Sequence, residues 1–159
     1  MRVGFGYDVH PLILGRKLIL GGEVIPYQKG LDGHSDADVL IHSLIDALLG
    51  AAGEGDIGQH FPDNAEQYKN IPSLKLLENT YEILKRKKFT VNNIDVSVVL
   101  EEPRIAPFFM SMKNNIAQVL KMSFEKINIK ATTNEKMGFI GRIEGAASYC
   151  VVSLNDCSD

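Results

Sequence analysis

An aspartate and a histidine stand two residues apart near the start of the chain, in the stretch GYDVH at residues 6–10. Small or apolar side chains alternate with polar ones around them, which predicts a β-strand over residues 1–10. Side chains two apart on a strand point to the same face, so Asp8 and His10 would project together as one edge of a metal site. A catalytic zinc ion usually takes a third protein ligand and keeps its fourth position open.

The third ligand has to come from elsewhere in the chain, and the remaining histidines are His34, His42 and His60. His42 lies in the most apolar part of a helix that the spacing predicts over residues 36–50. Asp8, His10 and His42 are therefore a candidate metal set. Spacing alone leaves other interpretations open, because a D-x-H pair occurs by chance and a lone helix histidine is commonly core-packed or exposed.

Two carboxylates accompany His42 on the predicted helix. Asp38, His42 and Asp46 lie four residues apart, so they share one helix face. A carboxylate beside a ligating histidine can orient the imidazole through its other ring nitrogen. Asp38 and Asp46 are candidates for this supporting role, and a solvated polar stripe on an amphipathic helix is the alternative.

The stretch ATTNEK at residues 131–136 carries groups that suit a diphosphate. It ends a predicted strand with the hydroxyls of Thr132 and Thr133, the carboxylate of Glu135 and the ammonium of Lys136. Hydroxyls and a cation bind phosphate oxygens, and a carboxylate can help to hold Mg²⁺. Threonine-rich strand ends are also common as purely structural features.

A second nucleotide contact is suggested by GDIG at residues 55–58, where Asp56 could accept hydrogen bonds from two ribose hydroxyls. The chain has neither a GxxxxGK[ST] nor a GxGxxG sequence, so neither standard phosphate-binding loop is present. Neither stretch is specific in isolation.

The elements that must position these residues follow from the pattern of the whole chain. The sequence predicts a hairpin over 17–26, a loop over 51–64, a helix over 72–88, a strand over 89–102 interrupted by a turn at Asn92-Asn93, a helix over 107–122, and strands over 126–133 and 145–156 joined by a loop over 134–144. Strands and helices are interleaved without strict βαβ regularity. We therefore expect an α/β protein of the α+β type, with a mixed four-stranded sheet, a short hairpin and helices on one face, as a single domain over residues 1–159.

Composition excludes several classes of protein. The 159 residues are 45% apolar, the net charge is −3, and no basic stripe suggests a nucleic-acid partner. No apolar run reaches the ~20 residues of a membrane span, and the start does not resemble a signal or transit peptide. With Cys150 and Cys157 read as free thiols, we expect a soluble protein of the reducing cytoplasm.

The succession GYDVH, GLDGHSDADVLIH, LLGAAGEGDIGQHFPD and KATTNEKMGFIGRIEG closely resembles the 2-C-methyl-D-erythritol 2,4-cyclodiphosphate synthase family. The resemblance runs from residue 1 to the last strand, in order and without large insertions. It implies an enzyme of non-mevalonate isoprenoid biosynthesis that converts 4-diphosphocytidyl-2-C-methyl-D-erythritol 2-phosphate to the 2,4-cyclodiphosphate and CMP. It further implies a phosphorus–oxygen lyase that forms a homotrimer, with its sheets facing the three-fold axis and its active sites shared between neighbours.

The resemblance also implies residue roles. Asp8, His10 and His42 match the ligands of one Zn²⁺ per subunit, Glu135 matches a ligand of a second ion, Mg²⁺ or Mn²⁺, and His34 and Thr133 match groups that stabilise the transition state. The implied substrate contacts are Asp8, Val9, His10, His34, Ser35, Asp56, Ile57, Gly58, Phe61, Pro62, Asp63, Asn64, Ala65, Leu100, Glu101, Glu102, Pro103, Arg104, Ile105, Ala106, Thr132, Thr133, Asn134, Glu135, Lys136, Phe139 and Arg142. Phe139, Arg142 and Glu144 would lie near the trimer axis, where an isoprenoid diphosphate is a further candidate ligand.

Two positions depart from the usual family pattern, with Arg104 in place of lysine and Asn134 in place of threonine. Arginine keeps the charge of lysine but not its geometry, and we expect cytosine preference to survive because backbone groups can carry base recognition. Two alternative functions are a zinc-dependent nucleotide-diphosphate phosphodiesterase, with Asp46 or His34 as the base, and a non-catalytic trimer that binds isoprenoid diphosphates or cytidine nucleotides.

Overall fold

A computed structural model describes residues 1–62 and 64–156. Asp63 and Cys157, both named above, lie outside the described residues. The strands are β1 (Arg2–Leu14), β2 (Leu18–Leu20), β3 (Glu23–Ile25), β4 (Lys29–Leu31), β5 (Phe89–Val99), β6 (Ile127–Thr132) and β7 (Gly145–Asp156). The α-helices are α1 (Val39–Ala52), α2 (Ile57–His60), α3 (Ser73–Arg86), α4 (Phe109–Leu120) and α5 (Gly138–Gly141), with short 3₁₀ turns at Glu66–Tyr68, Ala106–Phe108 and Phe124–Lys126.

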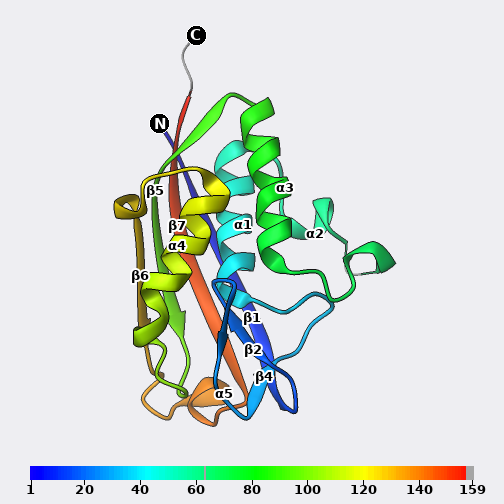
Figure 1. Cartoon of the computed structure of the whole chain (residues 1–159), viewed down its shortest axis with the longest axis vertical. Coiled ribbons are helices and arrows are strands. Elements are labelled where there is room, and N and C mark those ends of the chain that lie inside the picture. The colour runs from blue at the N-terminus through cyan, green and yellow to red at the C-terminus, as the bar shows by residue number, and fades with distance from the viewer. Residues whose placement is uncertain (63, 157–159) are drawn as a thin grey trace.

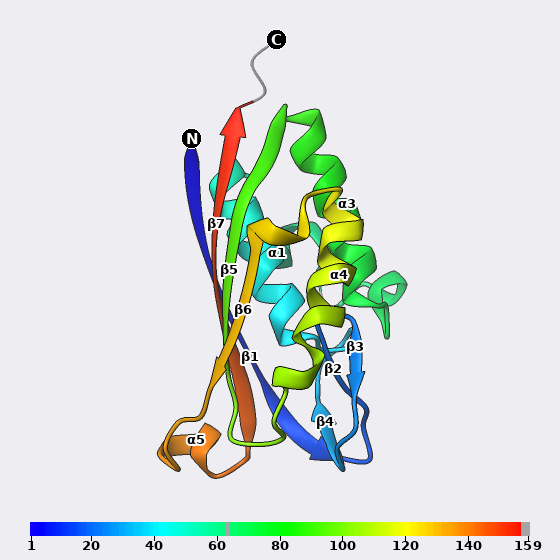
Figure 2. The same cartoon turned by 60° about the vertical axis from the view of Figure 1, so that its left-hand side comes forward.

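The main sheet has five strands in the order β4-β1-β7-β5-β6, and β2 and β3 form a separate hairpin. The β5–β6 pair is parallel and the other pairs of the sheet are antiparallel. The helices α1, α3 and α4 lie on one side of the sheet (Figure 1), and the turned view shows the opposite side without a covering helix (Figure 2). The mixed sheet, the hairpin and the one-sided helices are as predicted. The fifth strand is the correction, because β4 pairs with the end of β1.

Helix α1 packs closely against β1, because β1 presents glycines to it. A Cβ atom added to Gly4 would stand 1.9 Å from the carbonyl oxygen of Ala47, and one added to Gly6 would stand 1.9 Å from that of Ser43. Both oxygens belong to the backbone of α1, which cannot move aside. The two glycines therefore set the depth at which α1, and His42 with it, approaches the strand.

The two faces of β1 have different characters. Gly4, Gly6, Asp8 and His10 alternate with Val3, Phe5, Tyr7 and Val9, and the apolar set of four is exposed at 64%, 61%, 43% and 39%. Tyr149 and Val151 of the neighbouring strand β7 add to this exposed apolar face. One strand thus carries polar groups on its helix side and an uncovered apolar surface on the other.

Several boundaries differ from the sequence prediction. Helix α1 begins at Val39 rather than Asp36, because Asp38 is its N-cap and accepts a hydrogen bond from the amide of Ile41. The predicted turn at Asn92-Asn93 is a register irregularity within β5, which continues along β7. Short helices α2 and α5 occupy the two segments predicted as loops.

Two further predictions concern the chain as a whole. None of the described helices is long and apolar enough to cross a membrane. Cys150 is a free, fully buried cysteine, and burial raises the pKa of its thiol.

Candidate metal centre and substrate pockets

Asp8, His10 and His42 converge at the junction of β1 and α1. The Asp8 Oδ2 atom lies 2.9 Å from His10 Nε2 and 3.1 Å from His42 Nδ1, and these two nitrogens lie 3.1 Å from each other. Among the described residues, these three side chains form a group that could hold a metal ion. The pairing of residues 8 and 10 follows from strand geometry, whereas His42 joins them because α1 lies directly on β1.

The far nitrogen of His10 faces a backbone acceptor. Its Nδ1 lies 2.8 Å from the carbonyl oxygen of Asp32, and a carbonyl can only accept a hydrogen bond. In a neutral ring Nδ1 therefore carries the proton, which leaves the lone pair of Nε2 for a cation shared with Asp8 and His42. Arg16 supports this arrangement, because its guanidinium donates to the Asp32 side chain at 2.8 Å and to the Ser35 carbonyl.

The far nitrogen of His42 faces two hydroxyls. Its Nε2 lies 3.0 Å from Ser35 Oγ and 2.9 Å from Ser73 Oγ, and both serines are buried. Ser73 was not predicted from the sequence, because a serine directly after Pro72 indicates only the start of a helix. Outer partners of this kind fix the orientation of a metal-binding imidazole.

The electrostatics of the triad favour a bound cation. Burial raises the pKa of Asp8, but hydrogen bonds with His10 and His42 and the charges of both rings outweigh burial and lower the pKa to about 2. The carboxylate is therefore ionised near neutral pH and needs a positive charge beside it. A divalent cation held by one oxygen and two nitrogens would supply that charge.

The two carboxylates predicted to orient His42 have other partners in the structure. The Asp38 side chain is fully buried and accepts from the amides of Gly21, Gly22 and Ile41, at 3.0, 2.7 and 3.1 Å. It therefore ties the β2–β3 turn to the start of α1 rather than contacting the ring. Burial and the charge of Asp36 raise the pKa of Asp38 to about 7, while the three amides lower it.

Asp46 likewise has a backbone amide, and not the imidazole, as its hydrogen-bond partner. Its Oδ1 accepts from the amide of Ile57 at 3.0 Å, which fixes the first residue of α2. Burial raises the pKa of Asp46. Its role in the structure is thus to position the segment that contains Ile57 and Gly58.

A cavity of about 360 Å³ surrounds the triad. Its lining includes the predicted site residues Asp8, His10, His34, Ser35, His42, Ile57, Gly58 and Phe61, together with Gly33, Tyr68 and Leu76, which the motifs did not indicate. We call it the metal pocket. Asp56 caps α2 at the edge of this region, where it accepts from the amide of Gln59 at 2.9 Å. The structure also places Ala65 near it, since His34 Nε2 lies 3.1 Å from the Ala65 carbonyl oxygen.

A second cavity, of about 420 Å³, lies between the end of β5 and the end of β6. Its lining includes the predicted residues Leu100, Glu101, Pro103, Arg104, Ile105, Ala106, Thr132 and Thr133, with Phe109 and Ala131 in addition. We call it the strand-end pocket. It shares no lining residue with the metal pocket, so the two pockets of one chain contain different members of the predicted site. Glu102 is exposed and accepts from the Tyr27 hydroxyl at 3.1 Å.

The loop after β6 is held in an open, exposed turn. Thr133 Oγ1 lies 3.2 Å from Glu135 Oε1, and the amide of Asn134 donates to Glu101 Oε2 at 3.1 Å. Glu135 and Lys136 both adopt positive φ angles, 50° and 60°. The turn therefore presents the hydroxyl, the carboxylate and the ammonium of this stretch to the outside of the chain.

The predicted axis residues lie at the same end of the sheet as this turn, in α5 and just before β7 begins (Figure 2). Phe139 and Glu144 line a hollow of about 290 Å³ with Val9 and His10, and Arg142 pairs with Glu144 at 2.9 Å. Val9 thus projects from the uncovered side of β1, away from the metal pocket.

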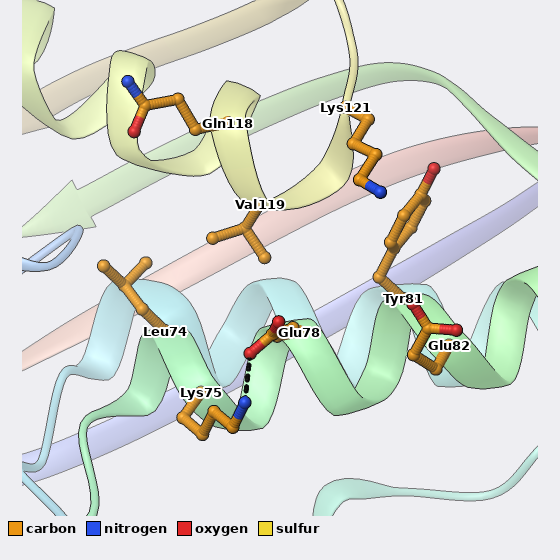
Figure 3. A pocket seen from close by; sticks show the side chains of 8 residues that line it. All are labelled: Leu74, Lys75, Glu78, Tyr81, Glu82, Gln118, Val119 and Lys121. Atoms are coloured by element: carbon orange, nitrogen blue, oxygen red, sulfur yellow. Dashed lines mark hydrogen bonds and ion pairs between the residues drawn. The ribbon is translucent and has the colours of Figure 1, made fainter.

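A hollow of about 370 Å³ lies between α3 and α4, where the Lys75–Glu78 ion pair and Val119 line it (Figure 3). None of the residues that line it is among the predicted site residues. The predicted site residues therefore line the metal pocket, the strand-end pocket and the hollow beside Phe139, and not the hollow between α3 and α4.

Comparison with known proteins agrees with the geometry. The model of the YgbB family matches residues 1–155. A 2-C-methyl-D-erythritol 2,4-cyclodiphosphate synthase of Desulforamulus reducens is 57% identical over 154 residues, which cover 97% of this chain and 98% of the relative. Its counterpart from Alkaliphilus metalliredigens is 55% identical over 97% of both chains.

Solved structures show the same fold. The bifunctional IspDF from Campylobacter jejuni superimposes with a TM-score of 0.93 and 46% identity, over 96% of this chain and 42% of that longer chain. IspF of Plasmodium falciparum, in its CDP complex, gives a TM-score of 0.87 and 31% identity, over 99% and 97% of the two chains. The chain belongs to the YgbB family, that of the 2-C-methyl-D-erythritol 2,4-cyclodiphosphate synthases.

Proposed function

We propose that this chain, as one catalytic domain over residues 1–159, converts 4-diphosphocytidyl-2-C-methyl-D-erythritol 2-phosphate to 2-C-methyl-D-erythritol 2,4-cyclodiphosphate and CMP. The observation that carries the proposal is the convergence of Asp8, His10 and His42 in a pocket that also contains His34. Family membership indicates which substrate the chain uses, because the relatives carry the name of this synthase. The reaction class is a phosphorus–oxygen lyase of the cytoplasm.

Two metal sites belong to the proposal. Asp8, His10 and His42 would hold one Zn²⁺ per subunit, because one carboxylate and two imidazoles leave the fourth position open for a phosphate oxygen. Glu135 would help to hold Mg²⁺ or Mn²⁺, which typically takes one or two carboxylates and completes its shell with substrate phosphates. When bound, these ions offset the negative charge of the phosphates.

The reaction makes modest demands on proton transfer. An oxygen of the 2-phosphate forms a bond to the β-phosphorus, and the bond from that phosphorus to the bridging oxygen breaks, so that CMP leaves with the electron pair. The nucleophile is already anionic near neutral pH, because the second pKa of a phosphomonoester is about 6. The absence of an evident general base in the motifs is consistent with this chemistry.

The residues of the chain therefore act mainly by position and charge. His34 and Thr133 would stabilise the transition state, Asp56, Ile57 and Gly58 would hold the ribose, and the segment from Phe61 to Ala65 would enclose the methylerythritol unit. Residues 100–106 would bind cytosine, with Arg104 at the rim of the strand-end pocket. Holding the two phosphates in line can supply roughly 7–11 kcal/mol of the barrier.

We further propose a homotrimer in which each active site joins the metal pocket of one subunit to the strand-end pocket of its neighbour. Two observations support this: the two pockets of one chain share no residue, and an apolar sheet face with Phe5 at 61% exposure has no helix over it. The uncovered sheets would face the three-fold axis. Phe139 and Arg142 would lie near that axis, where an isoprenoid diphosphate is a candidate ligand.

Phosphorus NMR of the purified protein with the substrate, Zn²⁺ and Mg²⁺ tests the proposed reaction. We expect CMP and a cyclic diphosphate from the wild type, and loss of both in His42→Ala. The matched control is His60→Ala, which removes a histidine that lies 2.7 Å from the Glu54 carbonyl oxygen and outside the triad. CMP with an acyclic product would indicate a phosphodiesterase, and binding without turnover by the folded, metal-loaded protein would indicate a non-catalytic trimer.

A further inference from the structure

A second aspartate of the HSDAD stretch, Asp36, reaches His42 through an intervening serine. Ser73 Oγ lies 2.9 Å from His42 Nε2, and the same hydroxyl is hydrogen-bonded to Asp36 Oδ1. The other carboxylate oxygen, Oδ2, accepts from the backbone amide of Ser73 at 2.9 Å. Asp36 therefore accepts hydrogen bonds from both the backbone amide and the hydroxyl of Ser73, and Ser73 is fully buried.

The chemistry of these groups gives each hydrogen bond a direction. A carboxylate only accepts, and a serine hydroxyl has one proton to donate. That proton goes to Asp36, so Ser73 Oγ is left with lone pairs facing His42. The hydrogen bond between Ser73 and His42 must then be donated by Nε2–H.

The direction of the hydrogen bonds from His42 through Ser73 to Asp36 decides which ring nitrogen of His42 lacks a proton. With its proton on Nε2, a neutral His42 keeps the lone pair of Nδ1 for a cation held together with Asp8 Oδ2 and His10 Nε2, which both lie 3.1 Å from Nδ1. The Asp32 carbonyl has the same effect on His10 directly. A hydroxyl alone is ambiguous, because it can donate or accept, and Ser35 at 3.0 Å from Nε2 is subject to the same ambiguity.

We propose that Asp36 is a positioning residue for the metal centre: through Ser73 it holds the proton of His42 on Nε2 and keeps Nδ1 available as the metal ligand. The inference rests on the proposed zinc site. It assigns no contact between Asp36 and substrate or metal.

The substitution Asp36→Asn tests the direction of these hydrogen bonds, because asparagine has nearly the same shape as aspartate. The Ser73 amide at 2.9 Å from Oδ2 is a closer donor than the Asp38 amide at 3.2 Å from Oδ1, so the oxygen of the new side chain should take the Oδ2 position. Its NH₂ group would then donate to Ser73 Oγ. The serine hydroxyl would have to donate to His42 Nε2, and the ring proton would move to Nδ1, where it competes with the metal.

The primary measurement is the zinc dissociation constant, obtained by competition with a chelator, for wild type, Asp36→Asn, Ser73→Ala and the double variant. Partners that orient metal-binding histidines typically contribute 10–100-fold to affinity, and we expect a loss in that range for Asp36→Asn. Ser73→Ala should lose less than about tenfold, because the Ser35 hydroxyl, which can donate or accept, remains available to accept from Nε2–H. The double variant should return to the affinity of Ser73→Ala, because it lacks the Ser73 hydroxyl that would donate to His42 Nε2 in Asp36→Asn.

Two further measurements separate positioning from folding. Thermal unfolding of the metal-free variants reports any loss of stability, and a purely structural role of Asp36 predicts that the double variant binds zinc worse than either single one. Nitrogen NMR of the imidazoles in the zinc-loaded wild type should show a protonated Nε2 and a metal-bound Nδ1 on His42.

The outcomes are distinguishable. If the wild type does not bind zinc, the proposed metal site fails and the inference fails with it. If the wild type binds zinc but Asp36→Asn binds equally well, or if zinc is bound through Nε2 of His42, the inference alone is overturned.

Discussion

The α-carbon of Gly6 faces the backbone of Ser43 so closely that an added methyl group would stand 1.9 Å from the Ser43 carbonyl oxygen. Ser43 directly follows His42 on α1, and Gly6 lies two residues before Asp8 on β1. This contact fixes the separation of strand and helix at the level of the metal ligands. The small size of residue 6 is therefore a condition for assembling the triad.

Gly6→Ala should destabilise the fold and weaken zinc binding together. Overpacking a well-packed interior typically costs about 1–3 kcal/mol, and the obstructing atom here is backbone, so we expect the upper part of that range or more. Thermal and denaturant unfolding would measure the stability of the variant, and chelator competition its zinc affinity.

Gly50→Ala is the matched control for this substitution. Gly50 lies on the exposed side of α1, and a Cβ added there meets no atom within 4 Å. Alanine in a helix is favoured over glycine by roughly 0.5–1 kcal/mol, so the control should be slightly more stable than wild type. Equal effects of the two substitutions would contradict the role given to Gly6.

The sequence predicted the principal strands and helices, because the periodicity of burial is local. It did not reveal β4, which has only the residues Lys29–Leu31 and exists as a strand through its pairing with β1. The turn predicted at Asn92-Asn93 fails for a related reason. The neighbouring strand β7 continues past these residues, and β5 accommodates them as an irregularity.

The site was partly predictable because the periodicity of a strand is a local property of the sequence. Asp8 and His10 follow from the period of a strand, but the face-sharing argument for Asp38 failed because the helix begins only at Val39. The side chain of a residue just before a helix caps it and need not follow the helix face. Ser73 and Asp36 meet His42 only through tertiary structure, since they lie on different segments of the chain.

Asp38→Asn should lower stability while leaving the zinc dissociation constant within about threefold of wild type, well below the effect of losing an orienting partner. The carboxylate accepts three amide hydrogen bonds in a fully buried position, and an amide side chain turns one of its two acceptors into a donor. A buried unsatisfied group costs about 1–3 kcal/mol. Equilibrium unfolding and chelator competition on the same preparation would check both parts, and a large loss of zinc affinity in the folded variant would restore the original sequence interpretation.

Zinc should stabilise the wild-type protein against unfolding, because a ligand that binds only the folded state shifts the equilibrium by mass action. At a hundredfold excess over the dissociation constant the gain is roughly 2.7 kcal/mol. Calorimetry with zinc and then with excess chelator would measure it. His42→Ala should show little response to either addition, and an equal response would place the stabilising ion elsewhere.

Phe5→Lys should dissociate the proposed trimer. The side chain is 61% exposed in the single chain and lies 6.4 Å, between ring centres, from Tyr149 on the same uncovered face. A charge buried there on assembly would be costly without a partner. Sedimentation velocity would report the mass, with Met110→Lys on the outer helix α4 as the control for a lysine that replaces an exposed apolar residue. A trimer that survives Phe5→Lys would move the interface away from this face.

Mixed trimers would test whether each active site is shared between subunits. His42→Ala removes one of the three proposed metal ligands from the metal pocket, and Thr133→Val removes a hydroxyl from the strand-end pocket. Each variant alone should therefore release little CMP. Co-expressed in equal amounts with different tags, the two chains should assemble at random around the three-fold axis. About one site in four would then combine an intact metal pocket with an intact strand-end pocket from the neighbour, and activity should return to about a quarter of wild type. A chain whose two pockets serve the same site internally would show no such recovery, because every subunit in the mixture carries one of the two defects.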